Sequence, residues 1–197
     1  MTKGDTKKAA ILDTALEAAR RDGLEALTIG SLAKSAEMSK SGLFAHFESK
    51  ANLQCEVLEH AAAVFVKEIV VPALNQPRGE PRLRALFENW LDWALAADDD
   101  AGGGCIFLAA AMELDDAEGP VRDFLVRTQR DWQETLRRSI RIAKEESHMR
   151  ADVDVDQLAY RIHANMMGFH YYARLLRDPN AEKRARDTFE SLLADGQ

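Results

Sequence analysis

Two short helical segments separated by a break, within residues 28–47, constrain the fold of this chain more than any other feature. Thr28 and Ser39 can each cap one segment, because a hydroxyl group at a helix N-terminus accepts a hydrogen bond from an otherwise unpaired backbone amide. Helices as short as these are unstable alone in water. They therefore need neighbouring helices against which their apolar side chains can be buried.

The flanking sequence supplies such helices. Residues 6–22 carry apolar side chains at three- and four-residue steps, which is the spacing of an amphipathic helix, and Gly23 ends the pattern. A second amphipathic run covers residues 50–71. We therefore expect residues 1–50 to form a three-helix domain built around a helix-turn-helix.

The rest of the chain, residues 51–197, has the pattern of a larger helical bundle. Proline and glycine indicate a turn near residues 72–81, and residues 98–104 predict a loop. Apolar residues recur at helical spacing in five further segments, which are 83–97, 105–114, 121–146, 155–177 and 181–193. No strand pattern is comparably strong, so we expect an all-α protein of about nine helices.

Composition limits the class of protein. A content of 46% hydrophobic and 30% charged residues is typical of a folded globular chain. No apolar stretch approaches the ~20 residues of a membrane span, and no apolar run follows the polar first residues as in an export signal. Cys55 and Cys105 are too few for a disulfide framework and too far apart for a metal-binding pair. We expect a cytoplasmic protein without a membrane partner, a metal or another cofactor.

The charge of the chain is unevenly distributed. The net charge is −7, but residues 1–50 hold eight Lys/Arg and seven Asp/Glu and thus carry +1, so the acidic excess lies in residues 51–197. This distribution is compatible with DNA binding through the first domain, because only the contacting face must attract phosphates.

The second short segment begins with residues suited to DNA. Short or flexible side chains at an exposed helix N-terminus can enter a major groove, where hydroxyl and ammonium groups meet base edges and phosphates. The residues expected there are Ser39, Lys40, Ser41 and Gly42, with Thr28, His46 and Lys50 flanking them at phosphates. The alternatives are that Ser39 only caps the helix, that Lys40 is an ordinary surface lysine, and that His46 is a core or surface histidine.

The segment resembles the N-terminal part of the TetR family of bacterial regulators. The resemblance covers roughly residues 6–60 and rests on Gly23, Leu24, Thr28, Ile29, Leu32, Ala33, Ser39, Leu43, His46, Phe47, Lys50 and Leu53. It implies a transcriptional regulator, more commonly a repressor than an activator, which binds a palindromic double-stranded DNA operator and is not an enzyme.

Three residues depart from the family pattern. Glu37 stands where glycine is usual, and we expect it to face away from the DNA backbone, whose phosphates it would repel. Gly42 replaces a typical Thr or Ala, and Phe44 replaces the usual Tyr. Because Phe44 cannot donate a hydrogen bond to a phosphate, it is expected either as an apolar DNA contact or as a core residue.

The resemblance also implies a homodimer formed by the last two helices. Apolar residues on these helices that could form the interface are Leu158, Ile162, Met166, Phe169, Phe189, Leu192 and Leu193. The alternative is that they belong to the core of a single chain.

In the same family, the C-terminal domain holds a small-molecule inducer, so residues 51–197 are expected to sense a ligand, here an apolar or aromatic one. The side chains that could line its pocket are Phe65, Phe87, Trp90, Phe107, Met112, Trp132, His163, Met167, His170 and Tyr171. An ordinary core position is the alternative for each. Ligand binding would reach the DNA-binding domain through the helix over residues 50–71 and release the operator.

Other classes of protein have less support. The sequence lacks the glycine-rich phosphate loop, nucleophile elbow and metal motif that would indicate an enzyme. A redox sensor using Cys105 is one alternative, and a metal-responsive regulator using His163 and His170 with Glu113 or Asp115 is another. A helical interaction module without a DNA role is a third, which the overall acidity favours.

Overall fold

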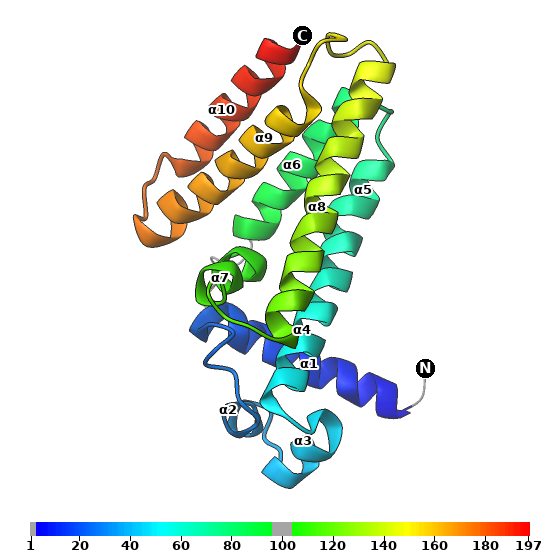
Figure 1. Cartoon of the computed structure of the whole chain (residues 1–197). Helices are drawn as coiled ribbons and strands as arrows, with labels where there is room; N and C mark the ends of the chain where they lie inside the picture. The colour runs from blue at the N-terminus through cyan, green and yellow to red at the C-terminus, as the bar shows by residue number, and fades with distance from the viewer. Residues whose placement is uncertain (1–2, 96–103) are drawn as a thin grey trace. The chain divides into compact units, whose positions relative to one another are not determined.

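The computed structural model describes the backbone of residues 3–95 and 104–197, and the side chains of residues 7–95 and 104–197 (Figure 1). Over this part of the chain all regular structure is helical, which confirms the all-α prediction. The loop expected at residues 98–104 lies outside the described residues, except for Gly104. No helix of the described chain has the length and apolar character needed to cross a membrane.

The helices follow one another in the order that the sequence predicts. Their bounds are α1 Lys3–Asp22, α2 Ile29–Ser35, α3 Lys40–Phe47, α4 Lys50–Phe65, η1 Val66–Val70, α5 Val71–Leu74, α6 Glu80–Leu95, α7 Ile106–Glu113, α8 Pro120–Glu145, α9 Val155–His170, η3 Tyr171–Leu175 and α10 Ala181–Gly196. The π-helical turns η1 and η3 continue α4 and α9 without a break. Counted as continuous helices, these elements make nine helices in the described residues.

The described chain divides into two compact units. One comprises Met1–Val64 with Ala97–Thr128, and the other comprises Phe65–Ala96 with Gln129–Gln197, each within the described ranges. The helices α4 and α8 therefore contribute residues to both units. The functional division at residue 50 stays a prediction, because compactness alone does not assign a function.

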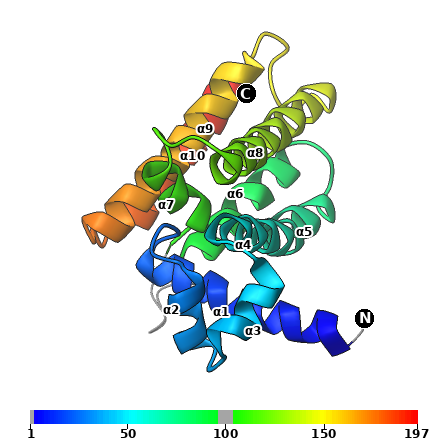
Figure 2. The ribbon, with the colours of Figure 1, turned by 60° about the horizontal axis from the view of Figure 1, so that its bottom comes forward.

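In the first unit the short helices α2 and α3 lie beside the longer helix α1 (Figure 2), as their shortness requires. The buried apolar side chains of this unit include Ile11, Ala15, Ala19, Leu24, Leu32, Leu43, Phe47, Leu53, Val57 and Leu58. Thr28 caps α2 in a reciprocal pair, because its Oγ1 accepts from the Ser31 amide at 3.0 Å while the Ser31 Oγ accepts from the Thr28 amide at 2.8 Å. The cap predicted at Thr28 is confirmed.

The second unit is held together by aromatic and aliphatic side chains of α6, α9 and α10. Figure 1 shows α9 and α10 lying side by side. The ring of Phe87 on α6 is stacked on that of Phe189 on α10, with centroids 4.0 Å apart and planes 4° from parallel. Trp90 of α6 meets Phe169 of α9 edge to face at 6.0 Å. Through these contacts α6 packs against both α9 and α10.

The π-helical turn η1 has a local cause. Pro72 has no amide to donate to the carbonyl of Glu68 four residues earlier, so the regular α-helical ladder is interrupted before it. The Val71 amide instead bonds to the Val66 carbonyl, five residues back. Asn89 of α6 donates its Nδ2 to the Ile69 carbonyl at 2.9 Å, which satisfies an acceptor within this turn.

Candidate DNA-binding surface and effector unit

The N-terminus of α3 is exposed and hydroxyl-rich. Ser39 caps the helix, since its Oγ accepts from the Gly42 amide at 3.1 Å, and the Ser41 Oγ lies 3.2 Å from the Ser39 Oγ. The side chains of Ser39, Lys40 and Ser41 are all exposed. The capping role of Ser39 therefore coexists with a position from which DNA could be contacted.

The exposed face of α3 continues one turn further. Phe44 is 57% exposed, so it is a surface residue and not part of the core. It follows Lys40 by four residues and therefore shares its side of the helix. Ala45, also exposed, extends this face beside Ser41, whereas Leu43 on the opposite side is buried. Ala45 was not among the predicted contacts, because a methyl group carries no chemical signal in a sequence.

Lys40 reaches from α3 towards the first turn of α2. Its Nζ lies 3.7 Å, and its Cε 3.6 Å, from the point that a β-carbon on Gly30 would occupy, and the Thr28 Oγ1 lies 3.7 Å from the same point. The ammonium group of Lys40 is thus close to the N-terminus of α2 and to Thr28. A cation and a helix N-terminus both favour anions, so their proximity suits a phosphate.

The two remaining predicted phosphate contacts have partners within the chain. His46 is half-buried, and its ring lies 6.2 Å from that of Phe47, centroid to centroid. The Lys50 Nζ forms an exposed ion pair with the Glu25 Oε2 at 3.1 Å. Exposed ion pairs contribute little, about 0–1 kcal/mol, so Lys50 could exchange Glu25 for a phosphate at low cost.

Glu37 occupies the turn between the two helices in a left-handed conformation. Its φ is +51°, a region that glycine adopts without strain and that other residues adopt at a cost. This explains why glycine is usual at this position of the turn. The side chain of Glu37 is exposed.

The predicted ligand residues do not all gather in one place. Phe65 and Trp132 do meet, edge to face at 5.0 Å, and Trp93 also packs edge to face on Phe65, at 5.7 Å. Phe87 and Trp90, by contrast, are buried against Phe189 and Phe169 in the core of the second unit. Phe107 and Met112 belong to the first unit, where Phe107 is buried and Met112 is 62% exposed. Met167 and Tyr171 are exposed on the second unit.

The Nε1 of Trp132 and the Nε2 of His170, both in the second unit, are buried without a hydrogen-bond partner among the described residues. A buried polar atom without a partner is costly, which makes such atoms candidates for a bound ligand. Burial lowers the pKa of both His163 and His170, and the nearby Arg174 contributes to the shift at His170. Both imidazoles are therefore neutral at neutral pH.

The seven predicted interface residues pack inside a single chain. None of Leu158, Ile162, Met166, Phe169, Phe189, Leu192 and Leu193 is more than 5% exposed. The exposed apolar side chains of the same region form a different stripe. It follows α9 into η3 at steps of four, three, four and four residues, and consists of Tyr160, Ala164, Met167, Tyr171 and Leu175.

The residues invoked for metal or redox sensing give those alternatives no support. No group of three or more His, Cys, Asp or Glu side chains in the described chain is arranged to hold a metal ion. Cys105 is buried, and burial raises the pKa of the half-buried Cys55 thiol, which disfavours the reactive thiolate.

Comparison with protein families gives two matches. The family of bacterial regulatory proteins called the tetR family matches residues 11–57, and the Tetracyclin repressor-like C-terminal domain matches residues 79–189. The sequence has no match among curated proteins.

Several solved structures share this fold. A TetR transcriptional regulator from Chloroflexus aurantiacus J-10-FL is 24% identical, with a TM-score of 0.83 over 98% of this chain and 96% of that one. A TetR-family transcriptional regulator from Streptomyces coelicolor is 18% identical, with a TM-score of 0.82 and the same coverage. A protein from Saccharomonospora viridis, solved in complex with choline, is 21% identical, with a TM-score of 0.79 over 95% of this chain and 97% of that one.

Proposed function

This chain belongs to the TetR family of bacterial transcriptional regulators, and we propose that it is a repressor that binds a palindromic operator as a homodimer and is released by a small apolar or aromatic ligand. The observation that carries the DNA-binding part is the exposed start of α3. There Ser39, Lys40 and Ser41 are exposed and Phe44 continues the same surface. A repressor acts on DNA in the cytoplasm, so this is the expected location.

The proposed DNA contacts fall into two groups. The base-reading group is the outward face of α3, formed by Ser39, Lys40, Ser41, Gly42 and Phe44. The phosphate-binding group flanks it and consists of Thr28, His46 and Lys50, with Lys40 reaching towards the same side of α2 as Thr28. Such a division is usual in helix-turn-helix proteins, where phosphate contacts set the register and base contacts supply the specificity.

We place the dimer interface on the exposed stripe of α9 and η3. Tyr160, Met167, Tyr171 and Leu175 are large apolar or aromatic side chains that a monomer leaves in water. A two-fold axis beside this stripe would cover the same side chains on both subunits. The seven buried residues of α9 and α10 would then support the interface from inside the protomer.

We place the ligand near the aromatic side chains of the second unit. Phe65, Trp93 and Trp132 offer ring surfaces, and the Trp132 Nε1 is a donor without a partner in the described residues. Neutral His163 and His170 can each donate or accept one hydrogen bond. The fit is to a ligand with an apolar or aromatic body and at least one acceptor group. Its binding would favour a state of the dimer whose α3 helices no longer match successive major grooves.

The salt dependence of DNA binding tests the proposal. A regulator that neutralises phosphates loses affinity steeply as salt rises, whereas a helical interaction module shows no such binding. Lys40→Ala should weaken binding and reduce the slope of log affinity against log salt by about 1. Lys183→Ala removes the same charge from an exposed site on α10 and should change neither quantity. An equal effect of both variants, or salt-independent binding, would contradict the proposal.

A further inference from the structure

The turn between α1 and α2 is held by a carboxylate from a distant part of the sequence. Glu113, the last residue of α7, accepts the Leu24 amide on its Oε1 at 3.2 Å and the Glu25 amide on its Oε2 at 2.7 Å. All three residues belong to the first unit. Hydrogen bonds from amides to an ionised carboxylate are stronger than those between neutral groups.

Gly23 allows the carboxylate to come this close. Its φ is +95°, which ends α1 in a conformation that suits glycine, and a β-carbon there would lie 3.0 Å from the Glu113 Oε1 and 3.3 Å from the Oε2. Any larger residue would push the carboxylate away from the two amides. The hydrogen bonds of Glu113 to this turn therefore depend on glycine at position 23.

Two residues of α4 also bind this turn. Gln54, a buried polar residue, donates its Nε2 to the Leu24 carbonyl at 2.7 Å and to the Glu25 Oε1 at 3.2 Å. Lys50 binds the other carboxylate oxygen of Glu25 at 3.1 Å. The turn that leads into α2 is thus fixed by one residue of α7 and two of α4.

We propose that Glu113 is a positioning residue for DNA binding, which fixes the α1–α2 turn and thereby the orientation in which α2 and α3 meet the operator. This inference rests on the proposed function. Glu113 lies within residues 79–189, which match the C-terminal domain of the family, whereas the turn lies within residues 11–57, which match the DNA-binding domain. One side chain therefore links the two family domains, and a ligand-dependent displacement of α7 would be transmitted through it to the turn.

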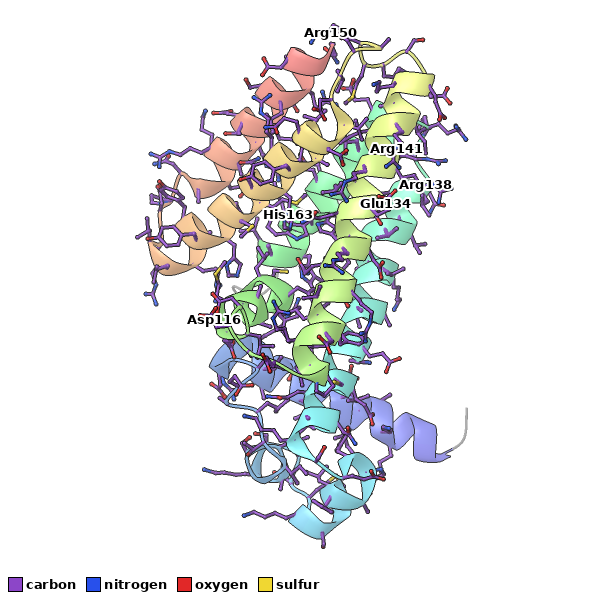
Figure 3. All side chains as sticks on the ribbon, in the orientation of Figure 1. Asp116, Glu134, Arg138, Arg141, Arg150 and His163 are labelled. Atoms are coloured by element: carbon purple, nitrogen blue, oxygen red, sulfur yellow. The ribbon has the colours of Figure 1, made fainter. Side chains whose placement is uncertain are left out.

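Hydrogen exchange of the full chain without DNA tests whether the Glu113 carboxylate holds the Leu24 and Glu25 amides. In Glu113→Ala the amides of Leu24 and Glu25 lose their acceptors, so their exchange should become at least about tenfold faster while the core amides of α4 stay protected. Asp116→Asn is the matched control, since Asp116 follows α7 closely and its carboxylate is exposed (Figure 3). It should leave exchange at both amides unchanged.

DNA binding tests the positioning role. The probe is the duplex that the wild-type chain selects from a random pool. Glu113→Ala should bind it about tenfold more weakly, equivalent to about 1.4 kcal/mol, at an unchanged helical content. Glu113→Gln should fall between Glu113→Ala and wild type, because a carboxamide offers one acceptor oxygen for the two amides. A loss of fold would instead lower the helical content of Glu113→Ala and would not give this graded order of affinities.

The outcomes separate the inference from the proposed function. Unchanged exchange at Leu24 and Glu25 in Glu113→Ala, or wild-type DNA affinity in both variants, overturns the role of Glu113 alone. A wild-type chain that selects and binds no duplex overturns the proposed function, and the positioning role with it. Should Glu113→Ala fail to fold, the comparison of Glu113→Gln with Asp116→Asn decides the matter by the same two measurements.

Discussion

The Oγ of Ser39 lies 3.1 Å from the backbone nitrogen of Gly42, and it is also 3.1 Å from the point that a β-carbon on residue 42 would occupy. The cap of α3 and the missing side chain at position 42 are therefore coupled. A larger residue at position 42 would therefore bring its β-carbon into contact with the capping hydroxyl.

Removal of the cap should destabilise α3. Ser39→Ala leaves the Gly42 amide without its acceptor, and loss of such a cap costs about 1 kcal/mol of unfolding free energy. Ser41→Ala removes a hydroxyl of the same surface that caps no amide, so it should weaken DNA binding and leave stability unchanged. Urea unfolding of both variants checks this prediction. Equal stability of Ser39→Ala and wild type would show that the cap contributes nothing.

Glu37 should be replaceable by glycine with a gain in stability. A left-handed conformation costs a residue with a β-carbon about 1–2 kcal/mol. Glycine avoids this strain, but because it loses more conformational entropy on folding, about 0.5–1 kcal/mol of the gain is offset. Glu37→Gly should therefore raise the unfolding free energy, whereas Glu37→Ala, which keeps φ at +51° with a β-carbon, should not. If Glu37 faces away from DNA, neither variant changes operator affinity. A large gain in affinity for both would place Glu37 at a phosphate.

Stability should fall on mild acidification because of the half-buried histidines His163 and His170. Burial lowers the pKa of His163, so between that pKa and the usual value of about 6.5 the unfolded chain binds more protons than the folded one. The stability associated with the neutral His163 side chain is thus complete above about pH 6.5, and it decreases as the pH falls below that value. His163→Gln should reduce the difference between the unfolding free energies measured in urea at pH 7.5 and at pH 5.5. His170 shifts in the same direction, so the difference should shrink and not disappear. An unchanged difference in His163→Gln would refute the assignment.

A charge within the α9 stripe should separate the dimer. Met167→Asp places a carboxylate at the middle of the proposed interface, where burial of an unpaired charge is costly. Sedimentation should show a dimer for wild type and a monomer for the variant at micromolar concentration. Ala151→Asp adds the same charge at an exposed turn residue and should remain dimeric. A dimeric Met167→Asp would place the interface elsewhere.

The sequence was most informative where local chemistry determines structure. The caps at Thr28 and Ser39 and the end of α1 at Gly23 each follow from the residues on either side, and the structure confirms all three. The place of Phe44 did not follow in this way, because the sequence allowed either a DNA contact or a core residue and only its exposure in the structure decides between them. Most of the helix-turn-helix could therefore be read without coordinates.

The inward side of α9 could not be predicted from spacing. Leu158, Ile162 and Met166 repeat at steps of four, but so do Tyr160 and Ala164 on another face, and a helix with two apolar faces gives no indication of which one the chain itself covers. The hydrogen bonds from the α1–α2 turn to Glu113 could not be predicted either, because 88 residues separate its carboxylate from the Glu25 amide. The π-helical turn before Pro72 had a visible cause, but proline alone does not specify how the helix accommodates it.

Selection of bound DNA from a random pool, at fixed salt and with the full chain, tests the central claim most directly. We predict enrichment of one palindrome whose half-sites are spaced for two α3 helices about 34 Å apart, on one face of the duplex. The same pool presented to Lys40→Ala should yield weaker enrichment. Failure of the wild-type chain to enrich any sequence, with retention of DNA no greater than that of a denatured sample, would contradict its assignment as an operator-binding repressor.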